Sequence, residues 1–488
     1  MDTQGKPGTT IGLDVSRMRY LPARAGVQEL HVIVTVRVEG AGGTGAGPGL
    51  AEVLVIDCSS SMDRPEEKFR AAKNAAVAAL RILPDGTPFA VVKGTHEAEL
   101  AYPAAGPMPA ATPALRAEAE RAVHGLLAAG GTCVGNWLDL SRRLLAERPA
   151  PIPHVLMLTD GRNEHDERRP LAGVLDDCDG RFVCDAWGIG DGWDAQVLLG
   201  VTRRLHGTAH GVREEAALPG EYRELVRGLL TKSVPELVIR VTTPPGSTVR
   251  YLKQVYPTEV PLPRTADQDP GSGTGTPGSR SGSYGFVTKA WGDETRRYQL
   301  CLTVDPAGRP QGEPLQVAVV AAELPGGGPA TLSPPSPCVV QWTDDPVLSR
   351  QADDQVLHFT AYQRLGQAVA RAADAYRQGQ PGRAEERLGE AVALAHGLGA
   401  RRQLAELRRL VEIHDAAAGR VELRRELRPV DFEHLITSSS YSTYGPGGGA
   451  DPEAGPPAGG LAPCPHCERP IPVGARFCPH CGRPPEAA

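Results

Sequence analysis

Short apolar strands alternate with helical segments between residues 50 and 232. The run 53–56 is apolar without interruption, which is typical of a strand buried on both faces of a parallel sheet. Further strands are expected over 89–92, 155–158 and 181–187, and helices over 65–82, 114–128, 135–146, 194–204 and 220–230. This alternation predicts a doubly wound, Rossmann-like α/β domain over 50–232.

The segments on either side of this domain alternate apolar and polar residues with a period of two. Strands are expected over 30–38, 237–241, 298–304 and 315–320, with no helix between the last three. They predict an antiparallel β-sandwich over 233–347. Residues 1–45 are expected to belong to the same sandwich, so that the α/β domain is an insertion in it.

The rest of the chain divides by composition. Residues 350–430 have a helical period and predict about three helices, broken near 379–382 and 397–399. The 57 Gly and 45 Pro of the 488 residues exceed the usual share, and the excess lies in the loops near 40–49, 267–283 and 326–337 and in the linker. A flexible linker is therefore expected over 437–463, followed by a zinc ribbon over 464–483.

The net charge and the lack of long apolar runs argue against several classes of protein. The net charge is −6 with a pI near 6.1, which disfavours nucleic-acid binding because phosphate contacts need clustered Lys and Arg. No apolar run is long enough for a membrane helix, and residues 1–17 lack the apolar core of a signal peptide. The expectation is a cytoplasmic protein with reduced cysteines.

Oxygen-bearing side chains follow two strands of the predicted α/β sheet. Strand 53–56 runs into Asp57, Ser59 and Ser61, and strand 155–158 runs into Asp160. Thr132 lies in a Gly-Gly-Thr loop before a helix. Ligands bind beyond the carboxyl ends of parallel strands, and carboxylates with hydroxyls suit Mg²⁺, Mn²⁺ or Ca²⁺. The pattern predicts a divalent-metal site, although Asp/Ser loops alone are also common turn chemistry.

This constellation resembles the metal-ion-dependent adhesion site (MIDAS) of the von Willebrand factor type A (VWA) family. The resemblance covers residues 50–232. It implies that Ser59 and Ser61 bind the ion directly and that Thr132 does so in the ligand-ready state. It implies further that Asp57 and Asp160 bind directly or through water. The ion would then bind the carboxylate of an Asp or Glu of a protein partner.

The flanking sequence resembles a bacterial, cytoplasmic group of such proteins. Landmarks of that group occur at 20–22, 94–96, 290–294 and 342–345, so that the resemblance extends over about 11–430. Members combine the VWA domain with a sandwich and a helical segment. The group is often encoded beside Ser/Thr kinases and phosphopeptide-binding domains, which implies a link to that signalling.

Four cysteines crowd into the last 25 residues as two CxxC pairs. Cys464 with Cys467 and Cys478 with Cys481 are separated by ten residues, a spacing that closes one tetrahedral Zn²⁺ site. A module of about 20 residues cannot build a core, so the metal must supply its folding energy. The pattern is similar to bacterial zinc ribbons. The alternatives are a redox CxxC, for which the surrounding βαβ unit is absent, or disulfides.

A run of hydroxyl side chains precedes the linker. It consists of Thr437, Ser438, Ser439, Ser440, Ser442 and Thr443, interrupted by Tyr441. Two interpretations are open: a solvated linker, or a phosphoacceptor segment that recruits a phosphopeptide reader.

Together these features predict a non-enzymatic interaction or scaffold protein. It would bind a partner carboxylate through the MIDAS metal, with further protein contacts from the helical segment and ribbon, and without nucleic-acid or membrane partners. The alternative is an accessory subunit of a separate ATP-driven remodelling or metal-insertion complex. A metallohydrolase is disfavoured because no general base neighbours Asp57 or Asp160 in the motifs.

Overall fold

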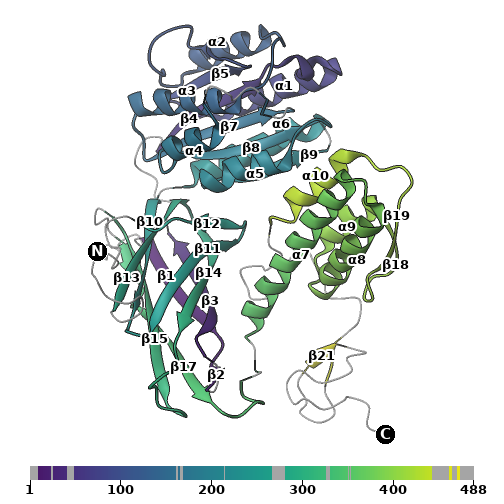
Figure 1. The fold of residues 1–488 in the computed structure, drawn as a ribbon. Coiled ribbons are helices and arrows are strands. Elements are labelled where there is room, and N and C mark those ends of the chain that lie inside the picture. Colours follow the sequence, from purple (N-terminus) through teal and green to yellow (C-terminus); the bar gives the residue numbers. More distant parts are fainter. Residues whose placement is uncertain are drawn as a thin grey trace.

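The structure, a computed structural model, has an α/β domain, a β-sandwich and a helical segment (Figure 1). It describes residues 9–23, 26–40, 49–160, 163–164, 169–213, 215–232, 234–265, 281–325, 330–349, 351, 353–441, 461–463 and 470–472. Among these residues, no helix is both long enough and apolar enough to cross a membrane.

The α/β domain is built on a six-stranded sheet with the order β6-β5-β4-β7-β8-β9. Every neighbouring pair is parallel except β5 with β6. The strands are β4 (Leu50–Asp57), β5 (Phe89–Gly94), β6 (Ala98–Tyr102), β7 (Ile152–Thr159), β8 (Val183–Ile189) and β9 (Ala209–Val212). The helices are α1 (Glu66–Ile82), α2 (Pro113–His124), α3 (Val134–Glu147), α4 (Leu171–Cys178), α5 (Ala195–Arg204) and α6 (Leu218–Leu230), with short 3₁₀ turns η1 (Ser60–Asp63) and η2 (Glu215–Ala217).

Helices cover both faces of this sheet, which explains why its strands are apolar throughout. Val53 and Val55 of β4 pack in the core under α3, α4 and α5. Leu54 and Ile56 point to the opposite face and pack under α1, α2 and α6. The predicted doubly wound α/β fold is therefore confirmed.

The sandwich consists of two sheets that share one core. One sheet has the order β12-β11-β14-β3-β1-β16, and the other has the order β13-β10-β15-β17-β2. The strands are β1 (Thr9–Arg17), β2 (Tyr20–Pro22), β3 (Gln28–Glu39), β10 (Val234–Thr243), β11 (Ser247–Tyr256), β12 (Val260–Leu262), β13 (Gly282–Trp291), β14 (Glu294–Val304), β15 (Pro314–Glu323), β16 (Ala330–Leu332) and β17 (Ser336–Thr343). Because β3 pairs with β14, the α/β domain is inserted between two halves of one sandwich.

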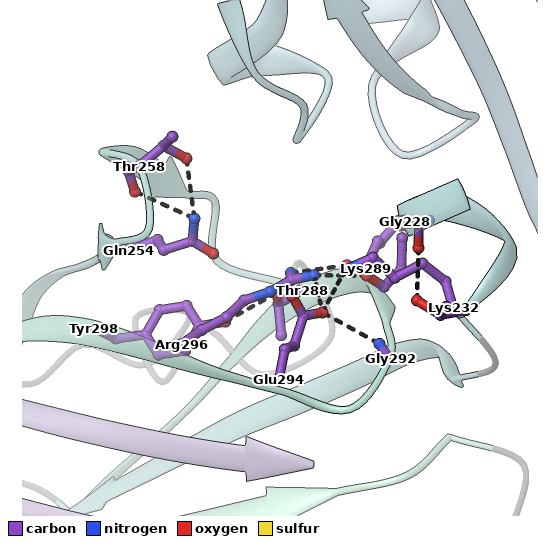
Figure 2. A network of polar contacts seen from close by, with 12 residues as sticks. Gly228, Lys232, Gln254, Thr258, Thr288, Lys289, Gly292, Glu294, Arg296 and Tyr298 are labelled. Atoms are coloured by element: carbon purple, nitrogen blue, oxygen red, sulfur yellow. Dashed lines mark hydrogen bonds and ion pairs between the residues drawn. The ribbon is translucent and has the colours of Figure 1, made fainter. Parts of the chain in front are cut away.

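A partly buried cluster of charges lies where the α/β domain returns to the sandwich. Lys232, just after α6, forms an ion pair with Glu294 at 2.7 Å, and Arg296 contacts the same carboxylate at 2.8 Å (Figure 2). Arg296 also donates to the carbonyls of Lys289 and Ala290 at 2.9 and 2.6 Å. Burial opposes ionisation of Glu294, but the two cations outweigh it and lower its pKa. The cluster fixes the connection between the two domains.

The C-terminal segment packs against both other parts (Figure 1). It contains α7 (Asp354–Arg377), α8 (Pro381–Gly397), α9 (Arg401–Leu410), the hairpin β18 (Val411–Asp415) and β19 (Arg420–Leu423), and α10 (Pro429–Ser438). Val356 and Phe359 of α7 pack on Ile33 and Val255 of the sandwich. The core of α7 to α10 is continuous with the core of the α/β domain. The hairpin is a difference from the wholly helical segment that the sequence predicts.

Helix α10 docks on β9 and α5. Glu433 of α10 accepts a hydrogen bond from the amide of Ala195 at 2.9 Å, which satisfies an otherwise unpaired N–H in the first turn of α5. His434 packs edge-on against Trp193, with ring centroids 5.2 Å apart. A Cβ on Gly211 of β9 would lie 2.4 Å from Nδ1 of His434, so this close approach requires glycine.

The structure contradicts the expectation that a flexible linker begins at residue 437. Thr437 and Ser438 complete α10, and Ser439 and Ser440 continue its last turn. All four are less than 10% exposed, and their hydroxyls donate to helix carbonyls three or four residues earlier. As placed here, these hydroxyls are inaccessible to a kinase. Ser442 and Thr443 lie outside the described residues.

The burial of His434 makes the docking of α10 sensitive to acid. Burial and then the Arg213 guanidinium lower the pKa of His434 from 6.5 to about 3. The unfolded chain binds this proton below pH 6.5, whereas the folded chain does not until about pH 3, so stability is lost as the pH falls. From pH 7 to pH 5, we expect His434 to contribute a loss of about 2 kcal/mol in the free energy of unfolding.

Urea unfolding at pH 5 and pH 7 measures this loss. His434→Gln should remove about 2 kcal/mol of the difference, whereas His414→Gln, at a half-exposed histidine on the hairpin, should leave it unchanged. An equal pH effect in the wild type and in His434→Gln would contradict the assignment.

Candidate metal centre

The sheet itself places the predicted metal ligands next to one another. Strands β4 and β7 are parallel neighbours, and Ile56 pairs with Leu158. Asp57 therefore lies beside Thr159 at the carboxyl edge, with Asp160 one residue further. The turn η1 follows β4 and contributes Ser61. Two parallel strands that end at the same level of the sheet thus bring together carboxylates from distant positions in the sequence.

Four of the five predicted ligands form one connected set of hydrogen bonds. The carboxylate of Asp57 accepts from the amide of Ser59 at 2.8 Å and from the hydroxyl of Thr159 at 2.5 Å. The hydroxyls of Ser59 and Ser61 are 3.0 Å apart, and Ser61 donates to Asp160 at 2.8 Å. Asp57, Ser59 and Asp160 are buried, whereas Ser61 is exposed. The set therefore opens to solvent at Ser61.

Thr132, the fifth predicted ligand, lies in a loop that is attached to the same edge. The carbonyls of Gly130 and Cys58 accept from the amides of Ser60 and Ala129 at 2.9 and 2.7 Å. A Cβ on Gly130 would lie 2.7 Å from His96, and the positive φ of 87° also favours glycine. Thr132 is buried, and in the described part of the chain no hydrogen bond joins its hydroxyl to the other four residues.

Comparison with known proteins identifies the domain that carries this site. A family model for the von Willebrand factor type A domain matches residues 52–211, and a zinc-ribbon model matches residues 464–484. A solved structure, a von Willebrand factor type A protein from Catenulispora acidiphila, is 32% identical with a TM-score of 0.78. The match covers 91% of this chain and 99% of that one. The chain belongs to the von Willebrand factor type A family.

A second solved structure shares the fold at lower identity. It is the ArnB paralog VWA2 from Sulfolobus acidocaldarius, 12% identical with a TM-score of 0.50, and the match covers 88% of this chain and 98% of that one. A search of curated proteins finds no match. The predicted family and the predicted zinc-ribbon domain are both confirmed.

The donor set of the VWA domain fits a small, hard cation. Ideal octahedral Mg²⁺, with metal–oxygen distances of about 2.1 Å, places neighbouring ligand oxygens about 3 Å apart. The separations of 3.0 Å between Ser59 and Ser61 and of 2.8 Å between Ser61 and Asp160 match that edge. Oxygen donors alone favour Mg²⁺, Mn²⁺ or Ca²⁺ over softer metals.

Burial makes one of these carboxylates costly to ionise in the absence of a cation. Desolvation raises the pKa of Asp57 to about 6, although hydrogen bonds from Ser59 and Thr159 oppose the shift. The buried carboxylate is therefore ionised only in part at mildly acidic pH. A divalent ion would favour the ionised form.

Lys68 is a component of the site that the sequence analysis missed. It lies in the first turn of α1, and its ammonium forms an ion pair with Asp160. The side chains of Lys68 and Asp160 are 6% and 1% exposed, so both charges are removed from water. The signal in the sequence was weak, because a lysine at the start of a helix is ordinarily solvated.

The zinc-ribbon cysteines cannot be placed in the same way. Cys464, Cys467, Cys478 and Cys481 lie outside the described residues. Strands β20 (Leu461–Pro463) and β21 (Pro470–Pro472) are described and pair antiparallel. In the sequence, the first CxxC pair stands between these two strands.

Removal of the Lys68 ammonium should have opposite effects on stability and on metal affinity. In Lys68→Met, Asp160 would keep a buried charge without a cationic partner, so we expect the metal-free protein to lose about 3 kcal/mol of stability. The metal would no longer compete with the ammonium for Asp160, so we expect Mg²⁺ to bind about tenfold more tightly.

Urea unfolding in EDTA and calorimetric titration with Mg²⁺ measure the two effects. Lys73→Met is the matched control, since Lys73 lies on the same helix but donates to the carbonyls of His124 and Leu126. An unchanged Mg²⁺ affinity in Lys68→Met would show that the ammonium and the metal do not compete.

Proposed function

We propose that this chain is a non-enzymatic protein-binding module, in which a divalent ion in the VWA domain binds an Asp or Glu of a partner protein. Asp57, Ser59, Ser61, Thr132 and Asp160 would hold the ion. The observation that supports this proposal is the connected oxygen set, which is buried except at Ser61. An ion held there has its open side toward the solvent, where a partner carboxylate can reach it.

The charge balance of the site supports an anionic ligand. Asp57, Asp160 and Lys68 have a net charge of about −1 when ionised, and a bound divalent ion would change it to about +1. An incoming carboxylate would neutralise this excess. In the described chain, the side chains bonded to the two carboxylates are hydroxyls and one ammonium, a set that suits binding better than acid–base catalysis.

Loss of a metal carboxylate should abolish metal binding and partner capture together. We expect Asp57→Ala to abolish Mg²⁺ binding in calorimetric titration, because the remaining donors cannot replace a buried carboxylate. Crosslinking mass spectrometry of the native protein should show crosslinks that need Mg²⁺ and disappear in EDTA and in Asp57→Ala.

Asp63→Ala is the matched control for this experiment. Asp63 is an exposed carboxylate in η1, close to the site in sequence but outside the hydrogen-bonded set. Crosslinks that persist in EDTA and in Asp57→Ala would reject the proposal. A separate ATPase among the metal-dependent partners would favour the alternative role as an accessory subunit.

The C-terminal module is proposed to hold one structural Zn²⁺ through its four cysteines. Ser442 and Thr443 are the hydroxyls of the tail that stay candidates for phosphorylation, because the four before Tyr441 are buried. A link to kinase and phosphopeptide signalling would be tested at these two residues.

The two metal sites should be independent of each other. We expect one Zn²⁺ for each chain in elemental analysis after dialysis, and its loss in Cys467→Ser, because three thiolates hold Zn²⁺ more weakly than four. Cys467→Ser should retain Mg²⁺ binding, and Asp57→Ala should retain Zn²⁺. A full zinc content in Cys467→Ser would contradict the assignment of this cysteine.

A further inference from the structure

The metal site opens into a cleft between the α/β domain and α10. The cleft has a volume of about 820 Å³, and Ser61 and Asp160 line one side of it. Val212 of β9, together with Arg428 and His434 from the α10 side, lines the other. A ligand of the metal would therefore lie in a cleft that is open to solvent and bordered by the α10 side.

The wall formed by α10 is held firmly in place. Arg213, next to β9, contacts Asp431 of α10 at 3.0 Å and also forms an ion pair with Glu406 of α9. All three side chains are less than 20% exposed. Together with the packing of His434 against Trp193, these contacts fix the width of the cleft.

Basic side chains outnumber acidic ones along the cleft. Its lining includes Arg64, Lys68, Arg213 and Arg428, against Asp160 and Asp191. Lys68 is already engaged in a buried ion pair, and Arg213 in partly buried ones. A divalent ion at the metal site would add to the positive excess, and this excess would attract an anionic ligand.

Arg64 and Arg428 are the two cations of the lining that stay exposed. Arg64 follows η1 on the α/β side, and Arg428 immediately precedes α10 on the opposite wall. Arg428 contacts Asp431 at a long distance of 3.5 Å, and its own side chain is 61% exposed. An arginine can hold a carboxylate or phosphate through two parallel hydrogen bonds, which makes both residues suited to a second anionic group.

We infer that the partner presents an extended acidic segment with two anionic side chains. One carboxylate would bind the metal, and the second anionic group, a carboxylate or a phosphate, would bind at Arg64 and Arg428. This inference rests on the proposed metal-dependent function and specifies its ligand. The cleft favours a narrow strand of peptide over a flat protein surface, because α10 stands beside the metal site.

Peptide binding tests the inference directly. The probes are fluorescent Gly/Ser peptides of roughly ten residues that contain one Asp, two Asp at increasing separations, or one Asp and one phosphoserine. With Mg²⁺ present, we expect the best peptide with two anionic groups to bind about tenfold more tightly than the peptide with one Asp. Comparison of the Asp and phosphoserine peptides distinguishes the two sources of the second charge.

Substitutions identify the residues that provide this gain. Arg64→Ala and Arg428→Ala should each reduce the affinity for the better peptide toward that of the single-Asp peptide, with Mg²⁺ affinity unchanged. Arg70→Ala, at an exposed arginine on α1 that contacts Glu67, should have no effect. Both test residues are exposed, so misfolding is not expected.

The outcomes separate the inference from the function on which it rests. A gain that survives both arginine substitutions, or no gain from a second anionic group, overturns the inference while metal-dependent binding stands. Failure of every peptide to bind also overturns it. Absence of Mg²⁺ binding in the wild type would instead reject the proposed function itself.

Discussion

The parallel pairing of β4 with β7 is the constraint on which the proposed metal site depends. These strands end in step, so that Asp57 and Asp160, about a hundred residues apart in sequence, follow neighbouring strands at one edge. The loop that carries Thr132 depends in addition on the positive φ of Gly130. Helices on both faces bury the strands, and this burial excludes water from the carboxylates. The same packing that stabilises the sheet therefore raises the pKa of Asp57 and favours a bound cation.

The sandwich and the helical segment place α10 beside the edge of the sheet where the predicted metal ligands lie. The sandwich receives strands from before and after the α/β domain, and the cluster of Lys232, Glu294 and Arg296 closes the connection (Figure 2). The helical segment then runs from the sandwich, through α7, back to β9, where α10 docks. The wall beside the proposed metal site thus includes residues of α10, the last described helix of the chain, in addition to Val212 of the VWA domain.

Structural elements that are determined by a few neighbouring residues could be predicted from the sequence. The apolar run 53–56 and the motif from Asp57 to Ser61 were sufficient to predict the parallel sheet and the cluster of oxygen side chains at its edge. The hydroxyl run 437–440 was misleading, because Ser and Thr favour loops unless their hydroxyls bond to helix carbonyls, as they do here. Its burial depends on contacts with distant residues, such as the hydrogen bond from Gln403 to the carbonyl of Ser438.

Lys68 shows that the electrostatic role of a residue, too, can depend on distant parts of the sequence. Nothing local distinguishes it from the solvated lysines and arginines of α1, and its role appears only when β7 brings Asp160 to it. The basic residues around the cleft fall into two groups, one largely buried and one exposed. Lys68 is buried, Arg213 is largely buried, and both are paired, so that removing either would leave an uncompensated carboxylate, which makes them structural. Arg64 and Arg428 are exposed, and their guanidinium groups can exchange water for a ligand at little cost to the fold. A cleft with two exposed arginines beside the proposed metal site is therefore suited to selecting among acidic ligands, in addition to binding them.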